Sequence, residues 1–285
     1  MNFGLKTKTE DFIEYLNAQP IYNEVGGALD VLNCYGVDWH DYEQSLNDID
    51  LDEIEFQNEI PPDYSSDHEY DRDGGILNMQ MYVDSISNAI NAALEQMVID
   101  ANNGARRLSM MVPKRKIFRS GDAILSFNYT STIEYLFAIP HDVSIFHIHG
   151  YYENGAPLIF GYRRTDGSYK SAWTFVDEEN ADYYISQQRE AVYTFYESWR
   201  KKLQTDNLRV FLSCCHEIDK VIVLGHSMSS VDAEYMEEIE RVLCPRCWDV
   251  SYYKVDDIEN VRFQGYSFEK KINFSSMAEL MKNCM

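Results

Sequence analysis

The sequence predicts a mixed α/β protein in which helices flank a mostly parallel sheet and a helical insertion lies in the amino-terminal half. Three observations support this fold class. Short apolar segments alternate with helical segments after residue 120, a long apolar stripe at helical spacing precedes them, and several short segments end in glycine and polar residues. Alternating strands and helices are typical of a parallel sheet that is covered on both faces.

The amino-terminal third is predicted to be helical and acidic. Residues 9–18 begin with a threonine that can cap a helix, and apolar residues follow at helical spacing. Residues 37–56 predict another helical turn or two, and residues 58–75, rich in Pro, Asp, Ser and Gly, predict a loop. Up to residue 75 the chain holds 19 acidic and 3 basic residues, which we interpret as a solvated face without chemistry.

A long helix is predicted from residue 76 to about residue 102. Its apolar residues recur at steps of three or four, the spacing of one helix face: Ile76, Met79, Val83, Ile86, Ile90, Leu94 and Met97, with Val98 alongside. A stripe of Met, Ile and Leu is typical of a helix packed on a core. We therefore expect residues 20–118 to form a largely helical, acidic insertion in a single domain of residues 1–285.

The second half of the chain is predicted to build the sheet. Strands are expected at residues 122–127, 142–150, 156–162, 219–227, 248–255 and 268–274. Helices are expected at residues 130–139, 177–204, 230–244 and 276–284. The order of these elements is the basis of the predicted fold class.

Composition narrows the classes of function. The net charge of −22 disfavours nucleic acids and anionic membranes as partners unless the cations cluster. One cluster exists, but no aromatic platform accompanies it, so we interpret it as a solvated loop with helix-end cations: Arg106, Arg107, Lys114, Arg115, Lys116 and Arg119. Without a recognisable membrane span or signal peptide, we expect no membrane partner and a cytoplasmic location.

The six cysteines suit reduced thiols more than a disulfide framework in a chain of this length. Cys244 and Cys247 form a lone CxxC pair. With Cys214 and His216 the pair has enough ligands for zinc, but we expect ordinary half-buried thiols and no metal, because a second pair at similar spacing is not visible.

Three predicted strands end in unusual residues: Asn128-Tyr129-Thr130, His147-Ile148-His149-Gly150 and Gly225-His226-Ser227. In a parallel sheet the carboxyl ends of the strands share one edge, and ligands bind there. Alternation along the second strand places its two histidines on the same face. The glycine of the third strand lets a ligand approach the backbone, and the following helix offers N–H groups to a phosphate.

These residues also have other interpretations. Asn128 can cap the following helix, although Thr130 or Ser131 can do the same. Ser227, His149 and Asp232 are the residue types of a serine hydrolase, but Ser229 replaces the second glycine of the G-x-S-x-G motif, and no histidine follows residue 226. A third interpretation is a small metal site of His147, His149 and His226, which requires that all three face one cavity.

Four blocks in this order, LSFNYTSTIEYLF, IFHIHG, PLIFGY and VIVLGHSMSSVDAEYM, resemble the AbiH family of bacteriophage abortive-infection proteins. The segments FGLKTKTEDFIEYL and VDWHDYEQSL match the style of the same family. The joint pattern is specific and covers most of the chain. The AbiH family in turn resembles the sirtuin-like fold of bacterial defence enzymes that cleave NAD, which implies a Rossmann-like, sirtuin-like sheet here.

The resemblance implies an antiviral defence protein that binds a small-molecule nucleotide, with NAD as its substrate and no bound cofactor. It would make Asn128 the amide that holds the nicotinamide ribose and the attacking water, and His149 the base that touches the ribose hydroxyls. The other residues that it assigns to the dinucleotide are Gly225, His226, Ser227, Asp232, Thr130 and His147, with Asp232 holding the loop or the helix start. Cleavage of the nicotinamide–ribose bond needs positioning, a proton acceptor and exclusion of water.

Two departures from the family pattern bear on this expectation. Thr130 stands where the NAD-cleaving relatives have Asp. The chain also begins at Met1 just after the place of a glycine-rich IGNGFD-type loop, so either the start codon is misassigned or this variant lacks a phosphate cradle. We therefore keep two functions open: hydrolysis of NAD or a related nucleotide, and a non-catalytic nucleotide-sensing or partner-binding module. In either case we expect a homo-oligomer.

Overall fold

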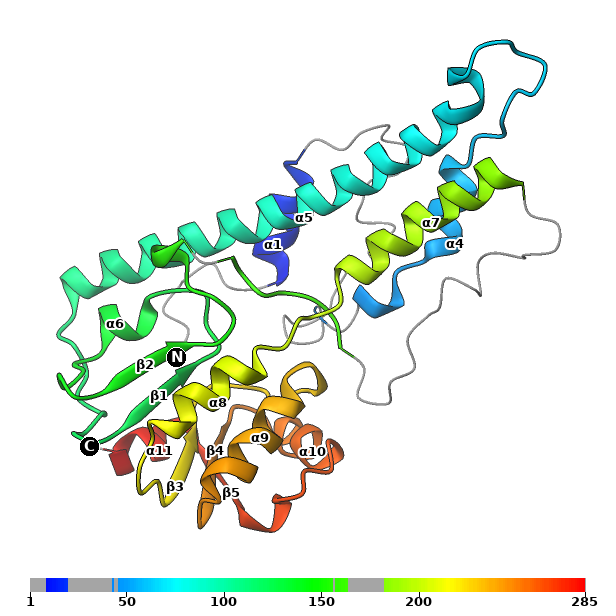
Figure 1. The fold of residues 1–285 in the computed structure, drawn as a ribbon. Helices are drawn as coiled ribbons and strands as arrows, with labels where there is room; N and C mark the ends of the chain where they lie inside the picture. Colours follow the sequence, from blue (N-terminus) through cyan, green and yellow to red (C-terminus); the bar gives the residue numbers. More distant parts are fainter. Residues whose placement is uncertain (1–8, 20–42, 44–45, 156, 164–181, 285) are drawn as a thin grey trace. The chain divides into compact units, whose positions relative to one another are not determined.

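The computed structural model describes residues 9–19, 43, 46–155, 157–163 and 182–284, and its fold is mixed α/β with short parallel strands (Figure 1). The chain forms two compact units. Val98–Ile159 and the segment from Lys202 onward build the α/β unit, and the described parts of Lys6–Met97 and Phe160–Lys201 build the helical unit. None of the described helices combines the length and apolar character of a membrane span.

Two parallel sheets form the α/β unit. In one sheet, β1 (Ala123–Ser126) pairs with β2 (Ser144–His147). In the other, β4 (Cys247–Tyr252) lies between β3 (Lys220–Val223) and β5 (Ile272–Ser276). Every pairing between these strands is parallel, as the alternation of strands and helices predicted.

The helices of the α/β unit follow the strands in the expected alternation. They are α6 (Thr132–Leu136), α8 (Thr205–Ser213), α9 (Ala233–Leu243), α10 (Val255–Phe263) and α11 (Met277–Cys284), with the short 3₁₀ helices η2 (Tyr152–Asn154), η4 (Ser230–Asp232) and η5 (Glu269–Lys271). Trp248 of β4 is fully buried in a cluster that includes Leu212 of α8 and Ile239 of α9. Ile148, which follows β2, belongs to the same cluster. The two sheets therefore share one core, although no strand pairing joins them in the described residues.

The helical unit is built from α1 (Thr9–Asn17), η1 (Leu46–Asp48), α4 (Leu51–Asn58), the first part of α5 (Tyr70–Met111) and α7 (Tyr183–Ser198). Asp50 caps α4 by accepting a hydrogen bond from the N–H of Glu53, and Asp182 caps α7. The fully buried amide of Gln188 on α7 accepts from the N–H of Ile60 and donates to its carbonyl, both at 2.9 Å. This pair of hydrogen bonds fixes the chain after α4 against α7.

α5 is the long helix that the apolar stripe predicted, and seven of the eight residues of the stripe are buried in it. Ile76 is the exception, being half-buried. The helix begins at Tyr70, inside the segment predicted to be a loop. Gly75 fits there because a Cβ atom at that position would lie 2.7 Å from the carbonyl oxygen of Ile60. Close packing against neighbouring backbone, which composition does not reveal, thus explains a glycine inside the helix.

Other boundaries also differ from the sequence prediction. The strand predicted at 156–162 is wrong: of its described residues only Tyr162 makes a bridge, to Arg200, and Gly161 with φ +143° interrupts extended pairing. In the segment 268–274, η5 precedes the strand, which begins at Ile272. The helix predicted at 37–56 appears as η1 and α4, and its residues 37–42 and 44–45 lie outside the described residues. The helix predicted at 177–204 includes α7, and its residues 177–181 also lie outside the described residues.

The single domain with an insertion at 20–118 stays a prediction.

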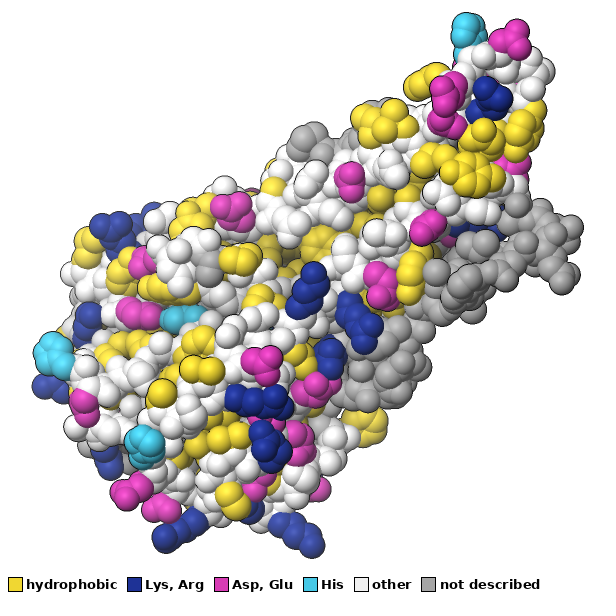
Figure 2. All heavy atoms as spheres, viewed as in Figure 1, with side chains coloured by type: hydrophobic (Ala, Val, Ile, Leu, Met, Phe, Trp, Pro, Cys, Tyr) yellow, Lys and Arg dark blue, Asp and Glu magenta, His cyan; other side chains and the backbone are white. Residues whose placement is uncertain are grey.

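Charge is unevenly distributed over the surface of each unit. Lys and Arg side chains gather over the carboxyl-terminal end of α5, and acidic and apolar side chains gather together where α5 begins (Figure 2). Arg106 and Arg107 lie on α5 and are exposed, as are Lys114 and Lys116 in the segment that follows the helix. The cationic cluster seen in the sequence is therefore a real surface feature of the α/β unit.

Candidate functional site

The residues that follow β1, β2 and β3 meet in the α/β unit. Phe127, after β1, lies with its ring centroid 5.2 Å from that of His149, after β2. The same phenyl ring is 4.2 Å from the imidazole of His226, which follows β3. Three strand ends that belong to two separate sheets thus contribute to one cluster, as expected for the carboxyl edge of parallel strands.

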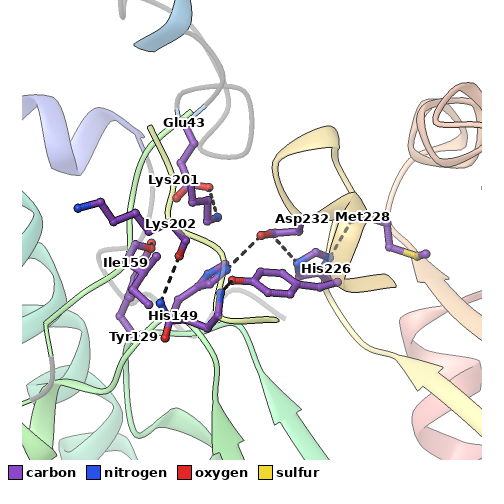
Figure 3. A network of polar contacts seen from close by, with 11 residues as sticks. Glu43, Tyr129, His149, Ile159, Lys201, Lys202, His226, Met228 and Asp232 are labelled. Carbon is purple, nitrogen blue, oxygen red and sulfur yellow. Dashed lines mark hydrogen bonds and ion pairs between the residues drawn. The ribbon is translucent and has the colours of Figure 1, made fainter. Parts of the chain in front are cut away.

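Asp232 joins the two histidines of this cluster (Figure 3). Its Oδ1 lies 3.1 Å from Nε2 of His149, and its Oδ2 lies 3.2 Å from Nε2 of His226. Asp232 is 5% exposed, and it sits at the end of η4, where α9 begins. A carboxylate in such a buried position is favourable only when donors surround it, so the two imidazoles and the carboxylate form one polar unit.

The hydrogen bonds of His226 fix its tautomer. Nδ1 of His226 accepts a hydrogen bond of 2.9 Å from the N–H of Met228, so the ring proton lies on Nε2 and is donated to Asp232. Met228 adopts φ +53°, a conformation that is unfavourable for a residue with a side chain. Its carbonyl accepts from the hydroxyl of Tyr266 at 2.9 Å. The turn after β3 is thus held in a strained conformation that presents His226 to Asp232.

His149 is less completely paired than His226. It is 3% exposed, and its Nε2 lies at ion-pair distance from Asp232, yet the direction of this contact does not satisfy a hydrogen bond and Nε2 has no other partner among the described residues. A buried ring nitrogen without a directed partner is uncommon in a folded protein. Nε2 of His149 is therefore the ring nitrogen of this cluster that contacts the carboxylate without a directed hydrogen bond.

Aromatic side chains surround His149. Tyr129 and Tyr235 have ring centroids at 6.0 and 5.9 Å from its imidazole, and both tyrosines are buried. Their hydroxyls are already engaged: Tyr129 donates to the carbonyl of Ile159 at 2.9 Å, and Tyr235 accepts from the N–H of Gln204 at 2.8 Å. The rings thus provide an apolar wall that strengthens the polar contacts of the His149, Asp232 and His226 group.

His147 belongs to a different cluster from His149. Its Nε2 is 2.8 Å from Oε1 of Glu134 on α6, its Nδ1 is 3.1 Å from the carbonyl oxygen of Asn128, and its ring stacks on Tyr151 with centroids 4.3 Å apart. Burial lowers the pKa of His147, but the bonds to Glu134 and to the Asn128 carbonyl outweigh burial and raise the pKa overall. His147 therefore contacts Glu134, whereas His149 contacts Asp232.

The remaining residues expected at the site lie around its edge. Asn128 is exposed, and its backbone makes two contacts: its N–H donates to Oγ of Ser126, and its carbonyl oxygen contacts His147. Thr130 is buried, with its hydroxyl 2.8 Å from that of Thr132. Gly225 adopts φ +67° and donates its N–H to Oγ of Ser251 at 2.8 Å.

Ser227 is half-buried between His226 and Met228. It forms no hydrogen bond with His149 in the described part of the chain, so the structure adds no support to the serine-hydrolase interpretation. Among the described residues no group of three or more His, Cys, Asp or Glu side chains has the arrangement of a metal site. Cys244 is exposed and Cys247 is half-buried, and both are free thiols.

Sequence reasoning missed three participants in these clusters. Phe127 was expected only as a strand residue, and Tyr235 only as part of a helix, yet both contact His149. Glu134, the partner of His147, was not recognised either. The available signal was spacing: Tyr235 lies three residues after Asp232 on one helical face, the spacing at which side chains are neighbours.

The fold and the cluster define a mixed α/β protein with a His-Asp-His group at the carboxyl ends of parallel strands, in which His149 and Asp232 are buried. The family model described as bacteriophage abortive infection AbiH matches residues 1–252. The chain belongs to the AbiH family, as the sequence blocks indicated, and its role is in the abortive-infection defence against bacteriophages. No curated protein and no solved structure is significantly similar to it.

Proposed function

We propose that this AbiH protein halts phage infection in the cytoplasm by hydrolysing NAD, or a related nucleotide, at the N-glycosidic bond. The observation that carries the proposal is the geometry of His149, whose buried Nε2 faces Asp232 without a directed hydrogen bond. Buried polar groups that lack a directed hydrogen bond are uncommon and are often found at catalytic positions. The family supplies the defence role, and the chemistry of the cluster suggests the reaction.

In this reaction the bond between C1′ of the ribose and the nicotinamide nitrogen breaks, and water adds to C1′. The proton released by the water passes to the imidazole of His149, which acts as a general base, and nicotinamide leaves as a neutral molecule. Asp232 orients His149 and stabilises the imidazolium that forms. In this proposal Asn128 holds the ribose and the attacking water. The rest of the nucleotide is contacted by Gly225, His226, Ser227, Thr130 and His147.

The proposal extends to the architecture of the sheet. We infer that β1 and β2, together with β3, β4 and β5, are parts of a Rossmann-like, sirtuin-like arrangement. Support comes from the exclusively parallel pairings and from the shared core. Support also comes from the position of His149 and His226 directly after β2 and β3, the place where such folds bind nucleotides.

Nicotinamide release from NAD by the purified full chain tests the proposal. Release by the wild-type protein should fall by about 100-fold or more in His149→Gln, the range that loss of a general base produces. The matched control is His141→Gln, which removes an exposed histidine of the same unit and should leave the rate unchanged. If His149→Gln and the wild-type protein release nicotinamide equally, His149 is not the base.

A second function is favoured by one specific observation. Asn128 is exposed and its backbone is engaged with His147, so its amide is not held toward His149 by a hydrogen bond in the described residues. This arrangement suits a non-catalytic module that senses a nucleotide. Calorimetry with NAD and ADP-ribose separates the two functions, because a sensor binds ligand without releasing nicotinamide, and a hydrolase consumes NAD during the titration.

A further inference from the structure

Two exposed surfaces of this chain are opposite in charge and similar in apolar content. The basic patch consists of Arg106, Arg107, Lys114 and Lys116 with Met110 and Met111. The acidic patch consists of Asp63, Asp67, Glu69 and Asp71 with Tyr64 and Tyr70. The basic patch belongs to the α/β unit and the acidic patch to the helical unit.

The basic patch is locally rigid and unneutralised. Met110 and Met111 end α5 and are 75% and 81% exposed, which is unusual for adjacent large apolar residues on a helix. The segment that follows is fastened to α6: the N–H of Arg115 donates to the carbonyl of Leu136, and Nζ of Lys114 donates to the carbonyl of Glu134. None of the four cations of the patch pairs with a carboxylate in the described residues.

Cations are often found in the last turn of a helix, where they offset the negative end of the helix dipole. That role does not explain these cations, because the last turn of α5 contains no basic residue. From residue 101 to residue 121 the sequence also contains no acid, whereas the whole chain carries a net charge of −22. The positive charge is therefore concentrated in one place and presented beside exposed methionine side chains. Such a surface is complementary to an acidic surface that also offers apolar side chains.

The acidic patch has this composition and is also locally ordered. The N–H of Asp63 donates to the carbonyl of Asp71 at 3.1 Å, and the hydroxyl of Ser66 donates to the carboxylate of Asp71, so the turn closes on the start of α5. Tyr64 and Tyr70 are 63% and 67% exposed on it. Aromatic rings are favourable neighbours for methionine sulfur, and carboxylates for arginine and lysine.

We propose that the basic patch binds the acidic patch of a second copy of this chain. The contact joins different surfaces of the two copies, so it generates either a closed ring or an open filament, depending on the rotation between copies. This inference concerns assembly and is independent of the proposed NAD hydrolysis. A nucleic acid fits less well, because phosphates gain nothing from the exposed methionines and no aromatic stacking platform lies in the basic patch.

Charge reversal with mixing tests this contact. Sedimentation velocity of the full chain at about 50 mM salt should show species larger than the monomer, and these should dissociate at about 500 mM salt, where charges are screened within a few ångströms. The variant Arg106→Glu/Arg107→Glu should sediment as a monomer, and so should Asp67→Lys/Glu69→Lys. An equimolar mixture of the two variants should assemble again, because each reversed patch then meets a reversed partner.

Matched controls have the same change in charge at other exposed positions. Lys270→Glu/Lys282→Glu in the α/β unit and Asp84→Lys/Glu95→Lys on α5 should assemble like the wild-type protein. Circular dichroism of every variant excludes unfolding as the cause of dissociation. A wild-type chain that stays monomeric at low salt overturns the proposal, as does a mixture of the two reversed variants that fails to assemble. Binding of the monomer to anionic vesicles, lost in Arg106→Glu/Arg107→Glu, would assign the basic patch to lipid instead.

Discussion

Oδ1 of Asp232 lies 3.1 Å from Nε2 of His149, although His149 follows β2 and Asp232 precedes α9. The opposite oxygen of the same carboxylate contacts His226. One buried acid therefore connects two histidines that come from different sheets of the α/β unit. The arrangement makes Asp232 the residue on which the geometry of the whole candidate site depends.

Asp232→Asn should weaken the contacts of both histidines while largely retaining the fold. Because Nδ1 of His226 accepts from the N–H of Met228, Nε2 keeps its proton, and an amide offers this N–H a single neutral oxygen in place of a carboxylate. We expect the ¹⁵N and proton shifts of the Nε2–H group of His226, measured by NMR, to report a weaker hydrogen bond. Unchanged shifts in Asp232→Asn would show that the carboxylate does not hold His226.

Gly150→Ala should destabilise the α/β unit and displace His149. Gly150 has φ +87°, and an added Cβ would lie 2.4 Å from the carbonyl oxygen of Pro157. Gly121→Ala is a matched control, since Gly121 also has φ +87° but nothing lies within 4 Å of its added Cβ. The control should cost about 1 kcal/mol of unfolding free energy, and Gly150→Ala roughly 2–4 kcal/mol, in chemical denaturation. Equal losses in the two variants would contradict the clash.

The pair of His147 and Glu134 should stabilise the protein at low pH. Despite burial, which acts in the opposite direction, the contacts with Glu134 and with the Asn128 carbonyl raise the pKa of His147 above its usual 6.5. The stabilisation is therefore complete below pH 6.5 and is lost as the pH rises through the raised pKa. Glu134→Gln should lower the pKa of His147 in an NMR titration and remove this pH dependence. A His147 pKa that is identical in Glu134→Gln would rule out the pair as its cause.

Glu55 should give the helical unit a pH dependence near neutrality. Burial, partly offset by Arg189 and reinforced by Asp52 and Glu59, raises the pKa of Glu55 from 4.5 to about 7. Burial thus outweighs the contact with Arg189 at 3.5 Å. A raised carboxyl pKa means that stability is highest below about pH 4.5 and falls as the pH rises through 7.

Denaturation of wild type and Glu55→Gln at pH 5 and pH 8 measures this effect. Between pH 5 and pH 8 the free energy of unfolding of the wild-type protein should fall by about 1–2 kcal/mol, after allowance for solvent screening. That of Glu55→Gln should fall by less. Glu95→Gln removes an exposed carboxyl of α5 and should behave like the wild type. The same pH slope in Glu55→Gln and in the wild type would exclude Glu55 as its source.

Patterns that depend on local spacing predicted much of this fold. The apolar stripe from Met79 to Val98 lies on the buried face of α5, and the strands that precede His149 and His226 pair in parallel with β1 and with β4, respectively. The same reasoning failed where tertiary contacts decide. Gly75 suggested a loop by composition, yet it lies inside α5, where its missing side chain leaves room for the carbonyl of Ile60.

The candidate site was predictable only in part, for a related reason. The strand ends pointed to His149 and His226, the family resemblance added Asp232, and the structure brings these three together. Alternation suggested that His147 would join them, but β2 ends at His147 and the chain beyond it no longer follows strand geometry. The partners Glu134 and Asp232 depend on how separate elements pack, which a local pattern does not encode.

Cells that carry the wild-type gene or Asp232→Asn, challenged with a phage that the wild-type protein resists, show whether defence depends on NAD hydrolysis at Asp232 and His149. Phage yield and cellular NAD are measured in the same culture, at equal abundance of the two proteins. We expect wild-type cells to restrict the phage while their NAD falls, and Asp232→Asn cells to do neither. Full protection by Asp232→Asn, or wild-type protection with constant NAD, would contradict a defence role that acts through NAD hydrolysis at this site.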